Sequence, residues 1–313
     1  MSDNTATRCG FAAIIGAPNA GKSTLVNRLT GTKVSIVSPK VQTTRTRVRG
    51  IMMAGEAQAV LVDTPGIFAP KRKLDEAMVS AALEGASEAD VTVLVVDAAS
   101  LAAHSGGRAA EETRAIIAKL KESKRDILLV LNKIDLMKPP QLLALAADLN
   151  ASNIFVETFM VSAETSDGVA ALSQAIARRM PLGPWLYPPD QAADLPQRLL
   201  AAEITREKLF LRLHDELPYA STVETDSWSQ QKDGSARIEQ TIFVERDSQK
   251  AIVIGKGGQS LKQIGASARV EMTSLFGHPV HLFLFVKVRP NWAEEPARFR
   301  EMGLAFPKAP RRG

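Results

Sequence analysis

Short apolar runs alternate with helix-length stretches over residues 11–180, and this alternation restricts the fold more than any other feature of the chain. The candidate strands are residues 11–15, 59–62, 91–96, 127–131 and 158–161. The candidate helices are residues 23–29, 74–86, 111–123, 141–149 and 169–180. Strands separated by helices predict an α/β domain with a mainly parallel sheet and helices on both faces. Ligands of such sheets bind outside the carboxyl ends of the strands.

Residues 16–23 read Gly-Ala-Pro-Asn-Ala-Gly-Lys-Ser, follow the first candidate strand and open the first helix. This context distinguishes a phosphate-binding loop from an ordinary glycine-rich turn. Backbone N–H groups can close around a β-phosphate, and the helix N-terminus adds partial positive charge. We predict that Lys22 reaches the β- and γ-phosphates and that the Ser23 hydroxyl binds Mg²⁺. The predicted nucleotide contacts of the loop are Gly16, Asn19, Ala20, Gly21, Lys22, Ser23 and Thr24.

The turn Asp63-Thr64-Pro65-Gly66 ends the second candidate strand. We predict that Asp63 holds Mg²⁺, directly or through water, and that the Gly66 N–H meets the γ-phosphate. Upstream, residues 42–45 read Gln-Thr-Thr-Arg and lie in a polar segment long enough to form a mobile loop. A hydroxyl there that completes the metal shell only with a triphosphate would make this loop a switch.

Asn132-Lys133-Ile134-Asp135 closes the strand at residues 127–131 and indicates which base is bound. The Asp135 carboxylate can accept two parallel hydrogen bonds from the N1–H and N2–H₂ groups of guanine, and adenine has neither donor there. A site built to pair with donors rejects a ligand that lacks them by roughly 10⁴ to 10⁵. The residues after the last strand place backbone N–H groups near the guanine O6. The predicted base contacts are Asn132, Lys133, Asp135, Ser162, Ala163 and Glu164.

A proline-rich segment, residues 181–196, cannot continue a helix and predicts a linker. The pattern beyond it is different. A candidate helix covers residues 197–217, strands follow at 220–227 and 236–245, then a short helix, a longer helix and a strand at 280–288. The order αββααβ does not extend the first sheet. We therefore predict a separate α+β domain.

The tetrapeptide Gly255-Lys256-Gly257-Gly258 lies between the two helices of this second domain. A lone G-x-x-G is weak evidence, because helix–turn–helix corners often contain glycine. Here the element order matches a type II KH domain, and a basic residue separates the glycines. In KH domains this loop clamps about four single-stranded nucleotides. The predicted RNA contacts are Gly255, Lys256, Gly257, Gly258, Lys262 and Arg269.

Basic charge is concentrated at the C-terminal end. Residues 246–313 carry 12 Lys and Arg against 5 Asp and Glu, a net charge of +7 in a chain whose total is +5. This distribution favours a polyanionic partner. The single cysteine, Cys9, excludes a disulfide within the chain and fits a reducing cytosol. With no long apolar run and no signal-peptide pattern, we expect a cytoplasmic protein.

The ordered motifs GAPNAGKS, QTTR, DTPG, NKID and SAE resemble those of translation-factor-class GTPases. In detail the chain is similar to the Era family of bacterial ribosome-assembly GTPases. The resemblance covers residues 1–180 as GTPase domain, 181–196 as linker, 197–290 as type II KH domain and 291–313 as a basic tail. It implies GTP and GDP as ligands, the 3′ end of 16S rRNA and the 30S precursor as partners, and a monomer.

The resemblance also selects Thr44 over Thr43 as the switch hydroxyl, so the predicted metal ligands are Ser23, Thr44 and Asp63. The predicted catalytic groups are Lys22, Thr44 and Gly66. Ile67 stands where many GTPases carry a water-orienting glutamine, and the family shares this hydrophobic residue. We therefore expect slow intrinsic hydrolysis. For Asn19 two readings stay open: it holds K⁺ beside the phosphates, as in related GTPases with Pro-Asn in this loop, or it only shapes the loop.

The leading prediction is a GTP-hydrolysing switch that binds rRNA during 30S assembly. A small-molecule kinase or ATPase would have no use for Asn132 and Asp135. A non-catalytic RNA-binding protein with a structural nucleotide domain would not need Lys22, Ser23 and Asp63. Three roles of the basic tail stay open. It folds onto the KH domain, it contacts rRNA or binds a membrane surface peripherally, or it is solvated.

Overall fold

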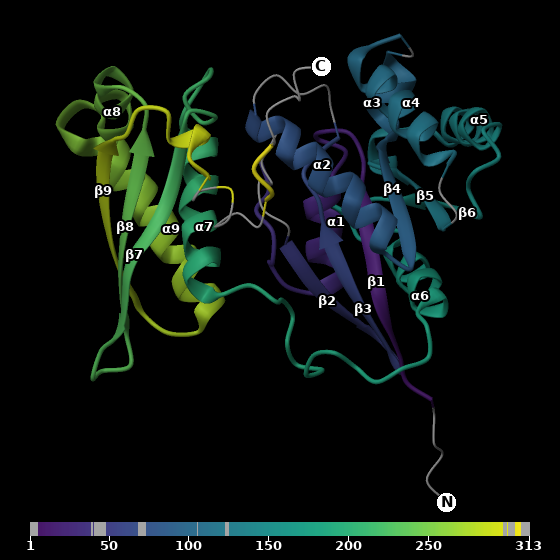
Figure 1. The fold of residues 1–313 in the computed structure, drawn as a ribbon, viewed down its shortest axis with the longest axis horizontal. Coiled ribbons are helices and arrows are strands. Elements are labelled where there is room, and N and C mark those ends of the chain that lie inside the picture. Colours follow the sequence, from purple (N-terminus) through teal and green to yellow (C-terminus); the bar gives the residue numbers. More distant parts are fainter. Residues whose placement is uncertain are drawn as a thin grey trace, which may run out of the picture. The chain divides into compact units, whose positions relative to one another are not determined.

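The chain forms two units, and it passes from the first to the second between Asp194 and Leu195 (Figure 1). The computed structural model describes residues 6–38, 40, 48–67, 73–104, 106–122, 125–296, 299 and 304–307. The N-terminal unit holds the described residues up to 35, 48–194 and 304–307. The C-terminal unit holds 36–38, 40, 195–296 and 299. Within the described residues, no helix is both long and apolar enough to cross a bilayer.

The N-terminal unit is built on a six-stranded sheet with the order β2-β3-β1-β4-β5-β6. The strands are β1 (Arg8–Ile15), β2 (Val48–Ala54), β3 (Ala57–Asp63), β4 (Val91–Asp97), β5 (Asp126–Asn132) and β6 (Glu157–Val161). All pairings are parallel except that of β2 with β3. The predicted mainly parallel sheet is therefore confirmed, with one antiparallel strand at its edge.

Helices cover both faces of this sheet (Figure 1). They are α1 (Lys22–Thr30), α2 (Lys73–Glu88), α3 (Ala98–Ala103), α4 (Arg108–Leu120), α5 (Pro139–Asn150) and α6 (Val169–Arg179). Side chains of β1 alternate between the two cores: Ile14 packs with α1 and α6, and Ile15 packs with α2, α3, α4 and α5. This alternation explains why β1 is a continuous apolar run, because both faces of the strand are buried.

The strand β2 was not predicted from the sequence. This strand pairs with β3 through a turn at Gly55, whose φ of 58° is a left-handed conformation that favours glycine. Its Arg49 side chain is exposed and forms an ion pair with Asp194 at 3.4 Å. Arg49 and Gly50 interrupt the strand, so the apolar run of β2 covers only residues 51–54.

Residues 181–194, most of the predicted linker, are hydrogen-bonded along the N-terminal unit. The Cys9 N–H donates to Pro181 O at 3.0 Å, and the Ile51 N–H donates to Ala192 O at 2.8 Å. The fully buried side chain of Gln58 accepts the N–H groups of Leu186 and Tyr187. Because these backbone groups are paired, this segment has a fixed path as far as Asp194.

The C-terminal unit has a three-stranded sheet, β7-β8-β9, in which β7 and β8 are antiparallel and β8 and β9 are parallel. Its elements are α7 (Gln197–Arg212), β7 (Ser221–Gln230), β8 (Ala236–Val244), α8 (Asp247–Ile254), α9 (Gln259–Phe276) and β9 (Val280–Val288). The order αββααβ agrees with the sequence prediction. The helices α7, α8 and α9 pack through buried side chains such as Leu209, Val253 and Ile264 against Ile242 of β8.

Part of the predicted tail packs into the C-terminal unit. Trp292 is fully buried, and its indole N–H donates to Ala220 O at 3.1 Å. Phe299 is also fully buried. The described part of residues 291–299 is therefore folded, whereas Lys308, Arg311 and Arg312 lie outside the described residues.

Candidate functional site

The predicted motifs of the N-terminal unit meet at one edge of the sheet. The phosphate loop follows β1, the Asp63 turn ends β3, Lys133 follows β5, and Ser162 follows β6. These strands are parallel, so their carboxyl ends lie at the same edge. The expectation that the motifs share the binding edge of the sheet is borne out by this arrangement.

The two glycines of the phosphate loop stand where a side chain cannot fit. A Cβ on Gly16 would lie 2.2 Å from the carbonyl oxygen of Val95 on β4. A Cβ on Gly21 would lie 2.1 Å from Asn132 Nδ2, and the φ of Gly21 is 90°. Asn19, between them, also has a positive φ, 62°. The loop is therefore pressed against β4 and the end of β5.

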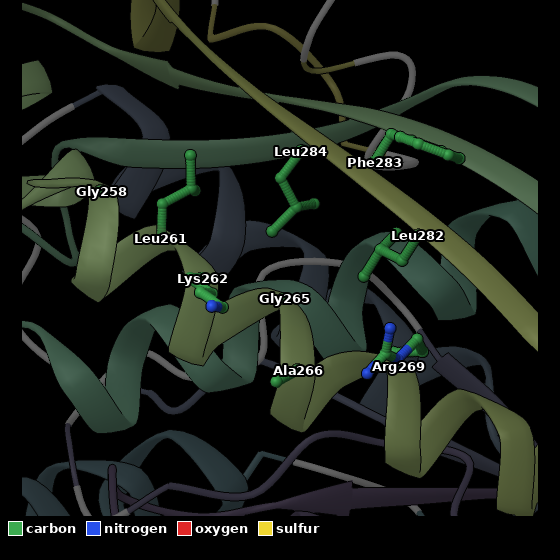
Figure 2. A pocket seen from close by; sticks show the side chains of 9 residues that line it. All are labelled: Gly258, Leu261, Lys262, Gly265, Ala266, Arg269, Leu282, Phe283 and Leu284. Carbon is green, nitrogen blue, oxygen red and sulfur yellow. The ribbon is translucent and has the colours of Figure 1, made fainter.

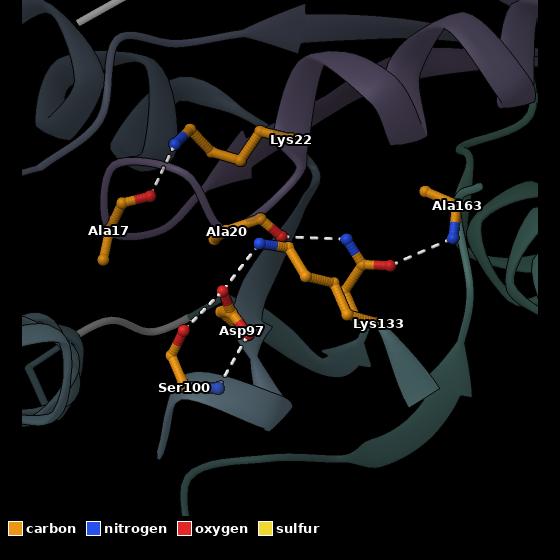
Figure 3. Close-up of polar contacts among 8 residues, drawn as sticks. Ala17, Ala20, Lys22, Asp97, Ser100, Lys133 and Ala163 are labelled. Atoms are coloured by element: carbon orange, nitrogen blue, oxygen red, sulfur yellow. Dashed lines mark hydrogen bonds and ion pairs between the residues drawn. The ribbon is translucent and has the colours of Figure 1, made fainter. Parts of the chain in front are cut away.

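Lys22 is buried and its ammonium group lies under the phosphate loop. Its Nζ donates to Gly16 O at 3.2 Å and to Ala17 O at 2.9 Å (Figure 3). Burial lowers the pKa of Lys22 to about 8, although the charges of Asp63 and Glu112 oppose the shift. A desolvated cation at this place attracts phosphate strongly, because few water molecules compete for it.

Asp63 collects two hydroxyl groups. Ser23 Oγ donates to Asp63 Oδ2 at 2.8 Å, and Ser35 Oγ donates to the same oxygen at 2.6 Å. The carboxylate is fully buried. Hydroxyl and carboxylate oxygens are the ligands that Mg²⁺ prefers, so this donor set fits the predicted metal. Ser35 was not predicted, and Thr44 lies outside the described residues. The described residues contain no cluster of His, Cys, Asp and Glu suited to another metal.

The turn after β3 rests on the phosphate loop. The Ile67 N–H donates to Gly16 O at 3.1 Å, and a Cβ on Gly66 would lie 2.9 Å from the backbone nitrogen of Pro18. The Ile67 side chain is buried in the apolar core with Ile15 and Ala17. Ile67 therefore faces the core, away from solvent.

The predicted base-binding residues except Ser162 line a cavity of about 220 Å³. Its lining consists of Gly21, Thr24, Asn132, Lys133, Asp135, Leu136, Ala163 and Glu164. Buried Asn132 braces the cavity: its Nδ2 donates to Ala20 O at 2.8 Å, and its Oδ1 accepts the Ala163 N–H at 3.0 Å (Figure 3). Asn132 thus joins the phosphate loop to the loop after β6. Buried Ser162 accepts the Thr165 N–H at 3.1 Å and shapes that loop from within.

Two residues that were not predicted from the sequence hold this pocket from outside. Arg28, on the last turn of α1, donates from Nε to Ala163 O at 2.9 Å and from its NH2 group to Glu164 O at 2.7 Å. Asp97, at the end of β4, accepts Lys133 Nζ at 2.6 Å and the Ser100 N–H at 2.9 Å. The Asp97–Lys133 contact spans 36 positions of the chain, and the Arg28–Ala163 contact spans 135. No local sequence motif therefore predicts them.

In the C-terminal unit, Gly255–Gly258 turns the chain from α8 into α9. Gly255, Gly257 and Gly258 have φ values of 73°, 59° and 75°. A Cβ on Gly255 would lie 2.7 Å from Ser260 Cβ, whereas Gly257 and Gly258 face open space. The exposed loop thus presents its backbone without side chains, except at Lys256.

A groove of about 410 Å³ continues from this loop between α9 and β9 (Figure 2). Its lining is Gly258, Leu261, Lys262, Gly265, Ala266, Arg269, Leu282, Phe283 and Leu284. Of the predicted RNA contacts, Gly258, Lys262 and Arg269 line the groove itself, and Gly255, Lys256 and Gly257 form the turn at its end. Apolar walls with two cations along one side suit a chain of bases joined by phosphates.

Comparisons with known proteins identify a GTPase domain followed by a KH domain. Residues 11–133 match a family model described as 50S ribosome-binding GTPase, and residues 216–293 match a KH domain model. The chain is 60% identical to GTPase Era of Afipia carboxidovorans over 304 residues, which is 96% of each chain. It is 57% identical to GTPase Era of Caulobacter vibrioides over 314 residues, covering 98% of this chain and 99% of the relative.

Two crystal structures are similar over almost the whole chain, each with a TM-score of 0.86 and 38% identity over 96% of this chain. One is an Aquifex aeolicus Era variant bound to GDP·AlF₄⁻, which is covered completely. The other is Era in complex with MgGDPNP and nucleotides 1506–1542 of 16S ribosomal RNA, covered to 99%. With a GTPase unit and a KH unit in this order, and identities of this size over both, the chain belongs to the Era family of GTPases.

Proposed function

We propose that this GTPase is a switch that hydrolyses GTP and binds the 3′ end of 16S rRNA through its KH unit during assembly of the 30S subunit. One observation carries the proposal. The chain has a pocket lined by Asn132, Lys133 and Asp135 and a groove that begins at Gly258 and is lined by Lys262 and Arg269. Over 96% of its length it also matches an Era structure solved with MgGDPNP and a 16S rRNA fragment.

In the nucleotide pocket, Asp135 would accept the N1–H and N2–H₂ groups of guanine, and the aliphatic part of Lys133 would line the base. The phosphate-loop N–H groups and Lys22 would stabilise negative charge on the β- and γ-phosphates as water attacks in line. Ser23, Thr44 and Asp63 would hold Mg²⁺. When bound, this ion neutralises charge on the phosphate oxygens. The Gly66 N–H would sense the γ-phosphate.

In the KH groove, the backbone of Gly255–Gly258 would approach the sugar-phosphate chain closely, because three of these four residues have no side chain. Lys262 and Arg269 would contact phosphates along α9. Leu261 and Leu284, which line the groove, would contact the faces of unpaired bases.

Substitution of Gly257 tests the RNA site. Gly257→Asp adds a negative charge to the exposed turn, and we expect affinity for a 16S 3′-end oligonucleotide to fall at least about 100-fold while the GDP dissociation constant is unchanged. Gly234→Asp is the matched control, because Gly234 also has a positive φ, 82°, and faces open space in the same unit. RNA affinity of Gly257→Asp equal to that of the control would overturn the assignment.

Phosphate release distinguishes the proposal from a non-catalytic RNA-binding protein. We expect the purified chain to release phosphate from GTP but not from ATP, slowly and only with Mg²⁺. A chain that binds GTP without ever releasing phosphate would favour the non-catalytic alternative.

We also propose that a K⁺ ion bound beside Asn19 assists hydrolysis. Asn19 lies in the phosphate loop and has a left-handed backbone conformation. Exchange of K⁺ for Na⁺ at constant ionic strength should slow phosphate release. An unchanged rate would leave Asn19 with its loop-shaping role alone.

We propose further that the protein is a cytoplasmic monomer and that its basic tail contacts the inner membrane surface peripherally. Co-sedimentation with anionic vesicles at low and high salt tests the membrane contact, since an electrostatic contact weakens with salt. Sedimentation analysis tests the monomer.

A further inference from the structure

Asp97 has no place in the nucleotide motifs, yet its carboxylate joins two elements at the binding edge. It is the N-cap of α3, and its Oδ1 accepts the Ser100 N–H at 2.9 Å. Its Oδ2 accepts Ser100 Oγ at 2.8 Å and Lys133 Nζ at 2.6 Å. Figure 3 shows the three contacts converging on one side chain. The Asp97 side chain is 12% exposed, so water screens these contacts only weakly.

Asp97 stays ionised at neutral pH. Burial alone would raise the pKa of its carboxyl group, but the hydrogen bonds from Lys133 and Ser100 outweigh burial and hold the pKa below its ordinary value. A permanent negative charge therefore faces the Lys133 ammonium.

Lys133 is the second residue of the Asn132–Asp135 motif and lines the base cavity. Its backbone φ is 66°, in the left-handed region that lysine rarely adopts. A lysine side chain has many rotamers, and fixing one costs entropy that a ligand must otherwise supply. The ion pair with Asp97 fixes the far end of this side chain (Figure 3), and the same residue lines the cavity.

We propose that Asp97 is a positioning residue for the base of the bound nucleotide: it holds Lys133 in the wall of the pocket before guanine enters. The proposal rests on the guanine site proposed above and adds to it a residue outside the sequence motifs. Asp97 acts only through Lys133 and does not itself touch the nucleotide. Its other role, capping α3, is structural and separable by experiment.

A double-mutant cycle on the full chain separates these roles. Asp97→Asn removes the charge and keeps an oxygen that can still accept the Ser100 N–H. We expect this variant to weaken GDP binding about ten-fold, the size expected when a hydrogen bond between charged groups is lost. In a Lys133→Met background, where the ammonium is absent and the unbranched stem remains, Asp97→Asn should weaken GDP binding less than about two-fold.

A ligand without a base gives the second readout. Inorganic pyrophosphate with Mg²⁺ occupies the phosphate loop alone, so its affinity should change less than about two-fold in Asp97→Asn. The matched control is Asp90→Asn, because Asp90 Oδ2 accepts the Phe11 N–H at 2.8 Å just before β4, at the opposite end of that strand. Its GDP affinity should equal that of the wild type.

Three results would overturn the proposal: unchanged GDP affinity in Asp97→Asn, equal losses for GDP and pyrophosphate, or a ten-fold further loss in the Lys133→Met background. The last two would leave Asp97 with helix capping only. Failure of the guanine site itself would show in a different variant, Asp135→Ala, which leaves the Asp97–Lys133 pair in place. That variant would then still prefer GDP over nucleoside diphosphates with other bases.

Discussion

At the scale of single residues, the nucleotide site depends on glycines that allow main chains to approach closely. Gly21 is the clearest case, because the space beside it is taken by the Asn132 side chain. Asn132 in turn connects the phosphate loop to the loop after β6. A side chain at residue 21 would therefore disturb the phosphate end and the base end of the pocket together.

We expect Gly21→Ala to weaken GDP binding at least about ten-fold, since a buried hydrogen-bonding side chain must move. Titration with a fluorescent GDP analogue measures this loss. Gly31→Ala is the matched control at the other end of α1: its φ is 73°, and an added Cβ meets nothing within 4 Å. Both substitutions place alanine in the left-handed region, at a cost of about 1–2 kcal/mol. Equal GDP affinities in the two variants would contradict the steric argument.

Ile67 gives a second prediction at this scale. Because its side chain is buried with Ile15 and Ala17, a glutamine there would bury an amide among apolar groups. We expect Ile67→Gln to lower the free energy of unfolding by about 2 kcal/mol without accelerating phosphate release. Urea denaturation and a phosphate-release assay measure the two effects, with Ile67→Val as the volume control. Ten-fold faster hydrolysis in the glutamine variant would show that residue 67 can reach the attacking water.

The residues of the site divide by whether a short sequence motif contains them. Lys22, Ser23, Asp63, Asn132 and Asp135 belong to short motifs at strand ends, and those motifs were readable from the sequence. Asp97 and Arg28 support the pocket only through contacts with distant segments. An aspartate that ends a strand and an arginine on a helix are common, so neither carries a local signal.

At the scale of elements, most strands were predicted from their apolar runs, and one edge strand and one short helix were missed. The strands β1, β3, β4 and β5 are apolar because both of their faces are buried. The edge strand β2 and the six-residue helix α3 escaped detection. The apolar run of the first, residues 51–54, covers only part of the strand. The second is too short to show helical periodicity and begins at the cap that Asp97 provides.

The segment after β9 shows what composition leaves open. Residues 291–313 are rich in basic residues, yet Trp292 and Phe299 are fully buried in the C-terminal unit. Charge counted over a segment does not reveal which of its aromatic residues find a core. Packing of the short helix Trp292–Glu294 therefore contributes to the stability of the KH unit.

We expect Trp292→Ala to destabilise the C-terminal unit by about 3–5 kcal/mol, as for other large buried aromatic residues. Trp292→Phe keeps most of the ring but leaves Ala220 O without the indole donor, and should cost about 1–3 kcal/mol. Hydrogen exchange of the β8 amides in the intact chain reports this unit alone. Unchanged protection of β8 in Trp292→Ala would mean that the segment contributes nothing to the core.

At the scale of the whole molecule, the chain combines a pocket that recognises one base with a groove suited to single-stranded RNA. The described residues that line the pocket all belong to the N-terminal unit, and those that line the groove all belong to the C-terminal unit. Sequence alone predicted this division because the change from βα alternation to the αββααβ order is visible in the hydrophobic pattern. The central claim is that guanine is the base that the nucleotide pocket recognises.

The most direct measurement of that claim is base specificity in Asp135→Asn. The asparagine amide can donate to the 2-oxo group of xanthine but can no longer accept both guanine donors. We expect the wild type to prefer GDP over xanthosine diphosphate (XDP). The variant should prefer XDP, with its GDP affinity reduced at least about 100-fold. Asp148→Asn, which alters an exposed carboxylate on α5, should leave both affinities unchanged. A variant that still prefers GDP as strongly as the wild type would contradict the account.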